Sequence, residues 1–183
     1  MLVAPFKVVL DANVLFPFSL RDTLLRAAAD EFFQLYWSEQ ILDEMERNLV
    51  AKGFITNDRA VKLRDAMVNA FPESAVVGYE SLIKSMPNHE KDRHVAAAAV
   101  KAGAQVIVTR NLKDFRQLPD GLEAQSPDEF LCNLYDLHPD AMVELLRRQA
   151  TALRNPPRSF DELLRGLAKM VPDFASIAAH AAP

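Results

Sequence analysis

The fold of this chain is constrained most by short, continuously apolar runs that are separated by longer segments with helical periodicity. The clearest runs are KVVL at 7–10 and QVIVT at 105–109, and further strand-like runs lie at 32–37, 74–78 and 122–125. Strands that are apolar on both faces are typical of parallel sheets covered by helices. Because these runs alternate with helical segments, the sequence predicts an α/β fold, with a parallel sheet flanked by helices on both faces.

Capping residues and helix stops predict where the helices of this α/β part begin and end. Ser19 is expected to cap a helix after the first strand, and Ser38 a helix after the second. A further helix is expected to begin at Asn57, before the third strand, and another at about Asp92, before the fourth. Gly103 is expected to end the last of them.

From Ser126 onward the pattern is helical only. His138-Pro139 and the NPP hinge at 155–157 interrupt it, and Ser159 with Glu162 predicts a capping box at the start of a further helix. We therefore expect an α/β domain over residues 1–132 and a helical C-terminal extension over 133–183.

Composition narrows the class of protein. The single cysteine, Cys132, excludes an intrachain disulfide and argues against a thiolate metal site. No apolar run approaches the ~20 residues that span a bilayer, and the N-terminal apolar stretch is too short for a signal peptide, so we expect a cytoplasmic protein without membrane association. The net charge of −4 argues against a wide nucleic-acid-binding surface. The arginines of the C-terminal third form either solvated helix faces or a surface for RNA or an acidic partner.

Acidic side chains gather at one edge of the predicted sheet. Asp11 directly follows the first strand, Asp114 follows the fourth strand in the segment TRNLKDF, and Asp92 opens the helix before that strand. Ligands of open parallel sheets bind outside the carboxyl ends of the strands, which is this edge. The helix after the second strand begins here too, and its first turns hold Glu39, Asp43, Glu44 and Glu46.

The conjunction of these acids predicts a divalent metal site, although each alone has an ordinary structural explanation. Clustered carboxylates repel each other and need a counter-charge to stay ionised at neutral pH. Oxygen ligands without a Cys or His cluster suit Mg²⁺ or Mn²⁺. On the second helix, burial of the apolar stripe argues against Asp43 as the contributing acid and leaves Glu44 and Glu46 open.

Other catalytic chemistries find little support in the sequence. Cys132 lies in an apolar helix and is expected in the core, and the chain's five glycines form no phosphate-binding loop. His94 is expected to be an ordinary residue of a first helical turn rather than a general base. The remaining histidines are scattered along the chain, at 89, 138 and 180.

Four segments in order resemble the PIN-domain ribonucleases, a family that includes the VapC-type toxins of toxin–antitoxin pairs. The segments are LDANVLF, SEQILDEMERNL, DRHVAAAAVKAGAQVIVT and RNLKDF, within residues 5–130. The resemblance implies a PIN-like sheet and a metal-dependent endoribonuclease that uses Mg²⁺ or Mn²⁺. Its four acidic ligands would be Asp11, Glu44, Asp92 and Asp114, which places the acid of the second helix at Glu44.

The resemblance also implies roles for the polar residues around these acids. Asn13, Thr109 and Asn111 would support the carboxylates, and the neighbouring cations Lys91, Arg93, Arg110 and Lys113 are candidates for phosphate contacts. An RNA substrate, a cognate antitoxin and a homodimer are further expectations from the family. The family motifs assign no role to the C-terminal extension.

Two other functions are alternatives to the nuclease. A phosphatase of the haloacid dehalogenase type needs Asp-x-Asp after the first strand, whereas residues 11–13 here are Asp-Ala-Asn. A non-catalytic PIN-like scaffold that binds RNA or protein is the second alternative. The presence of all four acids does not support it.

Overall fold

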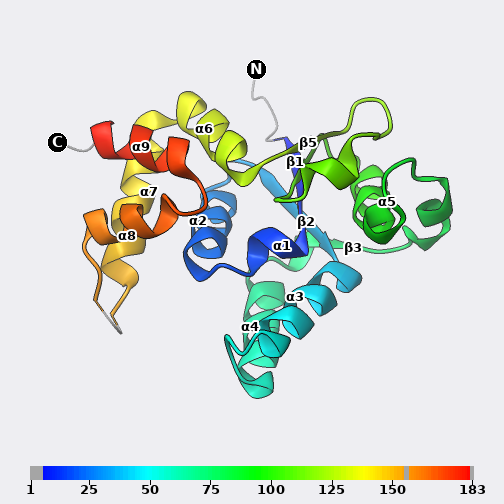
Figure 1. The fold of residues 1–183 in the computed structure, drawn as a ribbon, viewed down its shortest axis with the longest axis horizontal. Helices are drawn as coiled ribbons and strands as arrows, with labels where there is room; N and C mark the ends of the chain where they lie inside the picture. Colours follow the sequence, from blue (N-terminus) through cyan, green and yellow to red (C-terminus); the bar gives the residue numbers. More distant parts are fainter. Residues whose placement is uncertain (1–5, 155–156, 182–183) are drawn as a thin grey trace. The chain divides into compact units, whose positions relative to one another are not determined.

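The computed structural model describes residues 6–154 and 157–181, and it contains a five-stranded, all-parallel sheet (Figure 1). The strand order is β3-β2-β1-β4-β5. The strands are β1 (Lys7–Leu10), β2 (Gln34–Ser38), β3 (Ala75–Val76), β4 (Val106–Val108) and β5 (Glu123–Gln125). The predicted α/β class with a parallel sheet is confirmed.

The chain divides into two compact units. The first, here called the sheet unit, comprises the residues up to Phe16 and Phe33–Gln125; the second, here called the helical unit, comprises Pro17–Phe32 and the residues from Ser126 onward. This grouping differs from the expected division after residue 132, because helix α2 (Phe18–Ala29) joins the C-terminal helices. In the helical unit, α2 packs against α7 (Pro139–Ala152) and α8 (Phe160–Leu167).

The strand order reverses direction at the boundary between β1 and β4, and this is where a site is expected in an open parallel sheet. Val9 pairs with Ile107, and the amide of Asp11 donates to the carbonyl of Val108 over 3.1 Å. The chain therefore leaves the buried ends of two adjacent strands side by side at one edge. Asp11 and Thr109 are the first residues beyond them.

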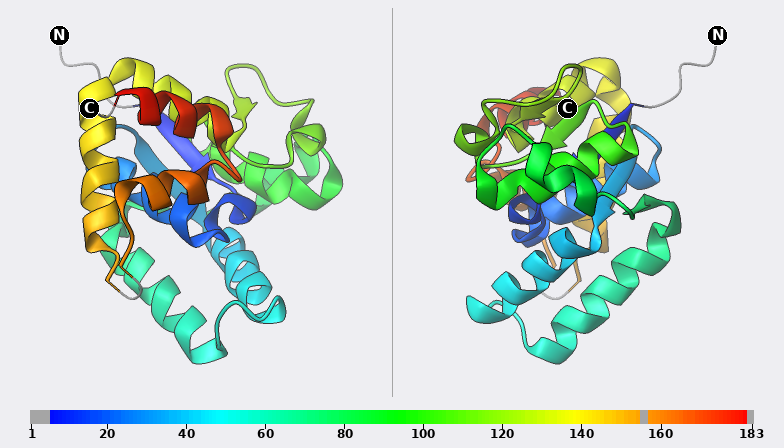
Figure 2. Two further views of the ribbon diagram at one scale, coloured as in Figure 1. Left: turned by 60° about the vertical axis from the view of Figure 1, so that its left-hand side comes forward. Right: turned by 90° about the vertical axis from the view of Figure 1, so that its right-hand side faces the viewer.

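The helices of the sheet unit position the remaining polar segments. These helices are α1 (Ala12–Leu15), α3 (Glu39–Ala51), α4 (Asn57–Ala70) and α5 (Arg93–Ala102). Helix α5 packs on β1, β2 and β4 through a run of buried alanines. It ends at Gly103, as predicted, and this C-cap glycine is in the left-handed conformation. Helices α3 and α4 lie side by side as a hairpin (Figure 2). Short 3₁₀ turns at Pro72–Ser74, Glu80–Ser85, Glu90–Asp92 and Leu112–Phe115 complete the unit.

The helical unit has its own core. Phe130 of α6 (Pro127–Leu137) and Phe174 of α9 (Pro172–Ala181) are fully buried in it, and Gln149 of α7 is buried while bonded to Thr23 and Ser19 of α2. The predicted capping box of Ser159 and Glu162 is confirmed. Of the predicted hinge, Asn155 and Pro156 lie outside the described residues. Within the described ranges, no helix is long and apolar enough to cross a membrane.

Several predicted boundaries were wrong. Helix α2 begins at Phe18, after Pro17, so Ser19 is a buried first-turn residue rather than an N-cap. Asn57 is the first residue of α4, and Thr56 is its N-cap. Strand β2 begins at Gln34 rather than at residue 32, because the amide of Phe32 still bonds the carbonyl of Ala27 at the end of α2.

Candidate active site

Asp11 is the most tightly held acid of the site. Its side chain is only 3% exposed, directly after β1. The hydroxyl of Thr109 donates to Asp11 Oδ2 over 2.7 Å, and Asn13 Nδ2 donates to the same oxygen over 2.6 Å. Asn13 also accepts from the amide of Arg110 over 2.9 Å. The segments that follow β1 and β4 are therefore tied together through one carboxylate.

Burial destabilises the negative charge of the Asp11 carboxylate. The pKa of Asp11 is raised from 3.8 to about 6. Desolvation by burial is the largest cause and the negative charges of Asp92 and Glu44 add to it, while the hydrogen bond from Thr109 opposes the rise. A carboxylate in this position is poorly stabilised as an anion by the protein alone. A divalent cation would stabilise it.

Asp92 and Asp114 form the second part of the site. Asp92 lies at the start of α5 and is buried, and Asp114 lies in the turn that follows β4. Asn111 Nδ2 donates to both carboxylates, over 3.3 Å to Asp92 and in a shorter bond to Asp114. Burial raises the pKa of Asp92, with contributions from Asp114 and Glu44, whereas the bond from Asn111 lowers the pKa of Asp114. The side chains of His89, Asp92 and Asp114 bring potential ligand atoms within 4.8 Å of one another.

The structure separates the two candidate acids of α3. Glu46 lies 3.4 Å from the guanidinium of Arg64, which also pairs with Asp43 and Glu39. Glu44 lies instead beside His94, with 3.6 Å between Glu44 Oε2 and His94 Nε2. This polar contact lowers the pKa of Glu44, and the charge of Glu44 in turn raises the pKa values of Asp11 and Asp92. Glu44 therefore belongs to the carboxylate cluster, and Glu46 faces Arg64.

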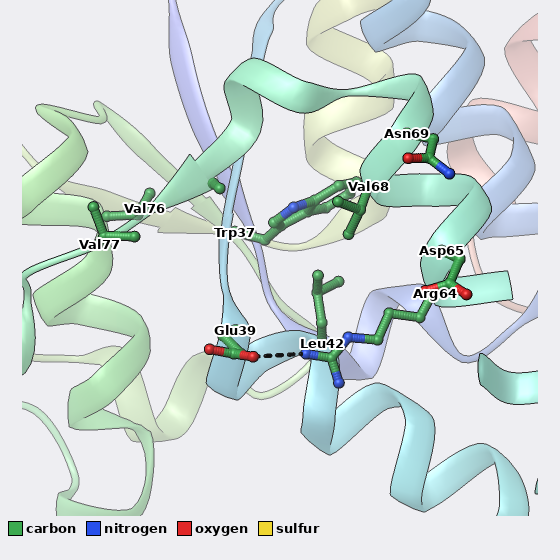
Figure 3. Close-up of a pocket in the computed structure, with 10 residues that line it drawn as sticks. Trp37, Glu39, Leu42, Arg64, Asp65, Val68, Asn69, Val76 and Val77 are labelled. Carbon is green, nitrogen blue, oxygen red and sulfur yellow. Dashed lines mark hydrogen bonds and ion pairs between the residues drawn. The ribbon is translucent and has the colours of Figure 1, made fainter. Parts of the chain in front are cut away.

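The Arg64 side of the α3–α4 hairpin borders a separate hollow of about 350 Å³ (Figure 3). Figure 3 shows Arg64 reaching from α4 toward Glu39, with Trp37, Leu42 and Val68 around the hollow. Its lining is mainly apolar, and none of the four predicted acids contributes to it. Of its two acids, Glu39 and Asp65, the first pairs with Arg64, so the hollow does not repeat the carboxylate cluster at Asp11.

The predicted phosphate-binding cations lie around the cluster with different environments. Lys91, Arg110 and Lys113 are exposed, whereas Arg93 is half-buried and its Nε donates to the carbonyl of Asn88 over 3.2 Å. A hollow of about 300 Å³ borders the cluster at Asp114, and its lining includes Lys113, Arg116 and Gln117. Arg116 was not predicted as a phosphate contact.

Two histidines near the carboxylates were missed as site residues. His94 does lie in the first turn of α5, as expected, but it is buried beside Glu44, and its Nδ1 has no hydrogen-bond partner in the part of the chain that the structure describes. His89 is close to Asp92 and Asp114 rather than scattered. The spacing of three residues between His89 and Asp92 was a signal, since a single turn brings such residues together.

The arrangement fits a divalent cation by the chemistry of its donors. Carboxylate oxygens converge on one edge of the sheet, and a buried anion among them lacks a positive partner within the set of groups that shift its pKa. Asn13, Thr109 and Asn111 hold the carboxylates in place through the hydrogen bonds described above. Such a set of rigid oxygen donors can hold Mg²⁺ or Mn²⁺.

Comparison with known sequences agrees with this edge-of-sheet site. The sequence model of the PIN domain matches residues 7–113, which is more than half of the chain. The chain therefore belongs to the PIN-domain family.

Its VapC type follows from two further matches. The model of the VapC50 C-terminal domain matches residues 127–180. A curated protein of Mycobacterium tuberculosis (strain ATCC 25618 / H37Rv), named "Putative ribonuclease VapC50", is 40% identical over 118 residues, covering 63% of this chain and 70% of that protein. No solved structure matches the chain.

Proposed function

We propose that this protein is a metal-dependent endoribonuclease and the toxin of a VapBC-type toxin–antitoxin pair. The observation that carries the proposal is Asp11, whose negative charge is destabilised by burial and by the charges of Asp92 and Glu44, between β1 and β4, where the strand order of this PIN-family sheet reverses. The printed name of the relative, which calls it a ribonuclease, supports RNA as the substrate.

Each group at the site has a role in this proposal. Asp11, Glu44, Asp92 and Asp114 would hold Mg²⁺ or Mn²⁺, which when bound polarises the scissile phosphate and lowers the pKa of a bound water. Glu44, whose Oε2 lies 3.6 Å from His94 Nε2, would be a ligand of the ion or would orient the attacking water. Lys91, Arg93, Arg110 and Lys113 would position the RNA through its phosphates.

The partners of the protein are also part of the proposal. We expect a cytoplasmic toxin, a homodimer, and a cognate antitoxin that covers the acidic site with a basic side chain. The residues 1–132 would carry the nuclease, and the extension over 133–183 would be a separate functional region, as its own family match suggests.

Cleavage of single-stranded RNA and tRNA by the purified protein tests the activity. We expect cleavage with Mg²⁺ or Mn²⁺ and none with EDTA. Asp65→Asn, at an exposed acid of α4, is the control and should cleave normally. Cleavage that persists in EDTA would contradict the metal-dependent mechanism. Absence of cleavage under every metal, with RNA binding retained, would favour the non-catalytic scaffold.

The pair Glu44→Gln and Glu46→Gln gives a sharper prediction within one helix. Glu44→Gln should lower the cleavage rate at least ~tenfold, because a general base or water-orienting carboxylate typically contributes 10²–10⁴-fold. Glu46→Gln removes only a partly exposed partner of Arg64 and should change the rate less than about twofold. Initial rates with saturating metal measure both. Equal losses in the two variants would contradict the assignment of Glu44 to the site.

A further inference from the structure

We propose that His89 is a ligand of the metal ion, and that its nitrogen shifts the preference of the site from Mg²⁺ toward a first-row transition ion such as Mn²⁺. The inference rests on the proposed function, since it assumes that the carboxylate cluster holds a divalent ion. It adds a nitrogen donor to a site that the sequence predicted to be formed by carboxylates alone.

The first support is the proximity of three potential donors. One ligand atom each from His89, Asp92 and Asp114 lies within 4.8 Å of the others. In octahedral coordination at ~2.1 Å, donor atoms lie ~3–4 Å apart. Small side-chain rotations would therefore close the three groups around one ion. His89 and Asp114 are not fully buried, so their side chains have room for this movement.

The backbone holds the imidazole next to both acids. The amide of His89 donates to the carbonyl of Asp114 over 3.0 Å, and the amide of Asp92 donates to the carbonyl of His89 over 2.9 Å. The loop before α5 is thus fixed to the turn after β4 at the position of His89. Among the described residues, the ring makes one hydrogen bond, which is long: the amide of Lys91 donates to Nδ1 over 3.4 Å. That contact is weak enough to give way to a metal bond.

The side chain of Asn88, next to His89, indicates that a hydrated ion binds at this position. Asn88 is 3% exposed, and neither Asn88 Oδ1 nor Nδ2 has a hydrogen-bond partner among the described residues. Buried amides are almost always satisfied, so an unpaired one points to a missing water or ion. Asn88 lines the hollow of about 300 Å³ together with His89 and Asp114. Waters carried by an ion at His89 would supply partners for this amide.

The donor type determines the consequence for metal choice. Mg²⁺ prefers oxygen ligands and keeps its waters, whereas imidazole is a good ligand for first-row transition ions. Replacing one oxygen donor by a ring nitrogen therefore favours Mn²⁺ over Mg²⁺. The negative charge of Asp92 and Asp114 still allows Mg²⁺ to bind, with lower relative affinity.

Paramagnetic Mn²⁺ provides a readout that does not depend on catalysis. Pulsed electron paramagnetic resonance of the Mn²⁺-loaded protein should show coupling to a ¹⁴N nucleus, and this coupling should be lost in His89→Gln. In competition titrations, His89→Gln should weaken Mn²⁺ binding at least ~tenfold and Mg²⁺ binding less than about threefold. His89→Asp should restore an oxygen donor and reverse the preference toward Mg²⁺. His180→Gln, at an exposed histidine of α9, is the matched control and should behave as the wild type.

Three results would overturn the inference. These are a nitrogen coupling that survives in His89→Gln, equal weakening of Mn²⁺ and Mg²⁺ in that variant, and absence of Mn²⁺ binding by the wild type. RNA cleavage by the same samples separates this inference from the proposed function. Nitrogen coupling without RNA cleavage would support His89 as a metal ligand and contradict the proposed nuclease activity. Metal-dependent cleavage without nitrogen coupling would support the nuclease activity and contradict the assignment of His89 as a ligand.

Discussion

Replacing Asp11 by asparagine is expected to abolish RNA cleavage and, at the same time, to make the metal-free protein more stable. The rate should fall at least ~100-fold, because the variant loses a buried anionic ligand. Stability should rise because the wild-type protein holds a carboxylate that its surroundings destabilise. A pKa raised from 3.8 to about 6, mainly by burial and also by the charges of Asp92 and Glu44, corresponds to a penalty on the order of 3 kcal/mol at neutral pH. Thr109 and Asn13 can still donate to the amide oxygen of asparagine.

The same shift gives a pH dependence with a definite sign. The folded protein binds the Asp11 proton more tightly than the unfolded chain, so the contribution of Asp11 to the free energy of unfolding falls as the pH rises from about 4 to about 6. Urea unfolding in EDTA at several pH values measures this contribution as the difference between wild type and Asp11→Asn. Asp120→Asn, at an exposed loop acid, is the control. Mg²⁺ at pH 7 should stabilise the wild type more than Asp11→Asn, which loses one of the four acidic ligands. A variant less stable than the wild type at pH 7 in EDTA would contradict the electrostatic account.

Replacing Phe174 by alanine is expected to destabilise the helical unit by about 3–5 kcal/mol. The ring is completely buried between helices of that unit, and truncating a buried Phe leaves a cavity as well as losing apolar burial. Thermal or urea unfolding followed by circular dichroism measures the loss.

Two probes make the Phe174→Ala result specific. Leu137→Ala removes a side chain that is 62% exposed at the end of α6, and it should change the free energy of unfolding by less than about 0.5 kcal/mol. The single tryptophan, Trp37, lies in β2, so its fluorescence follows the sheet unit separately. A loss below about 1 kcal/mol in Phe174→Ala would mean that the cavity is refilled by its neighbours.

The central strands were predictable because their sequences carry a strong physical signal. In β1 and β4, consecutive residues are apolar since both faces are buried, and the predicted runs match to within two residues. The edge strand β3 is only two residues long, and the run at 74–78 overestimated it. Ser19 has the right chemistry for an N-cap, but tertiary packing uses it inside α2, where its carbonyl accepts from Gln149, which is 130 residues away. A contact between residues so far apart in the chain cannot be predicted from the local sequence pattern.

The candidate site was predictable to a similar degree. The rule that ligands bind at the carboxyl ends of parallel strands brought Asp11, Asp92 and Asp114 together from three segments. The choice between Glu44 and Glu46 could not be made from the helix alone, because both flank its apolar stripe and the residues that distinguish them, Arg64 and His94, lie on other helices. His94 meets Glu44 across 50 residues of chain. Pairings of this kind depend on how helices pack, which the local sequence does not specify.

The membership of α2 in the helical unit has a consequence for fragments of this protein. The two family matches follow each other along the chain, at 7–113 and 127–180, and they suggest a cut between them. A fragment that ends at residue 125 would keep α2 but lose α7 and α8, against which it packs. The buried leucines of α2, at positions 20 and 24, would become exposed, and the fragment would gain an apolar surface prone to aggregation. The two family matches divide the chain into consecutive segments, whereas α2, which lies in the first segment, packs with helices of the second.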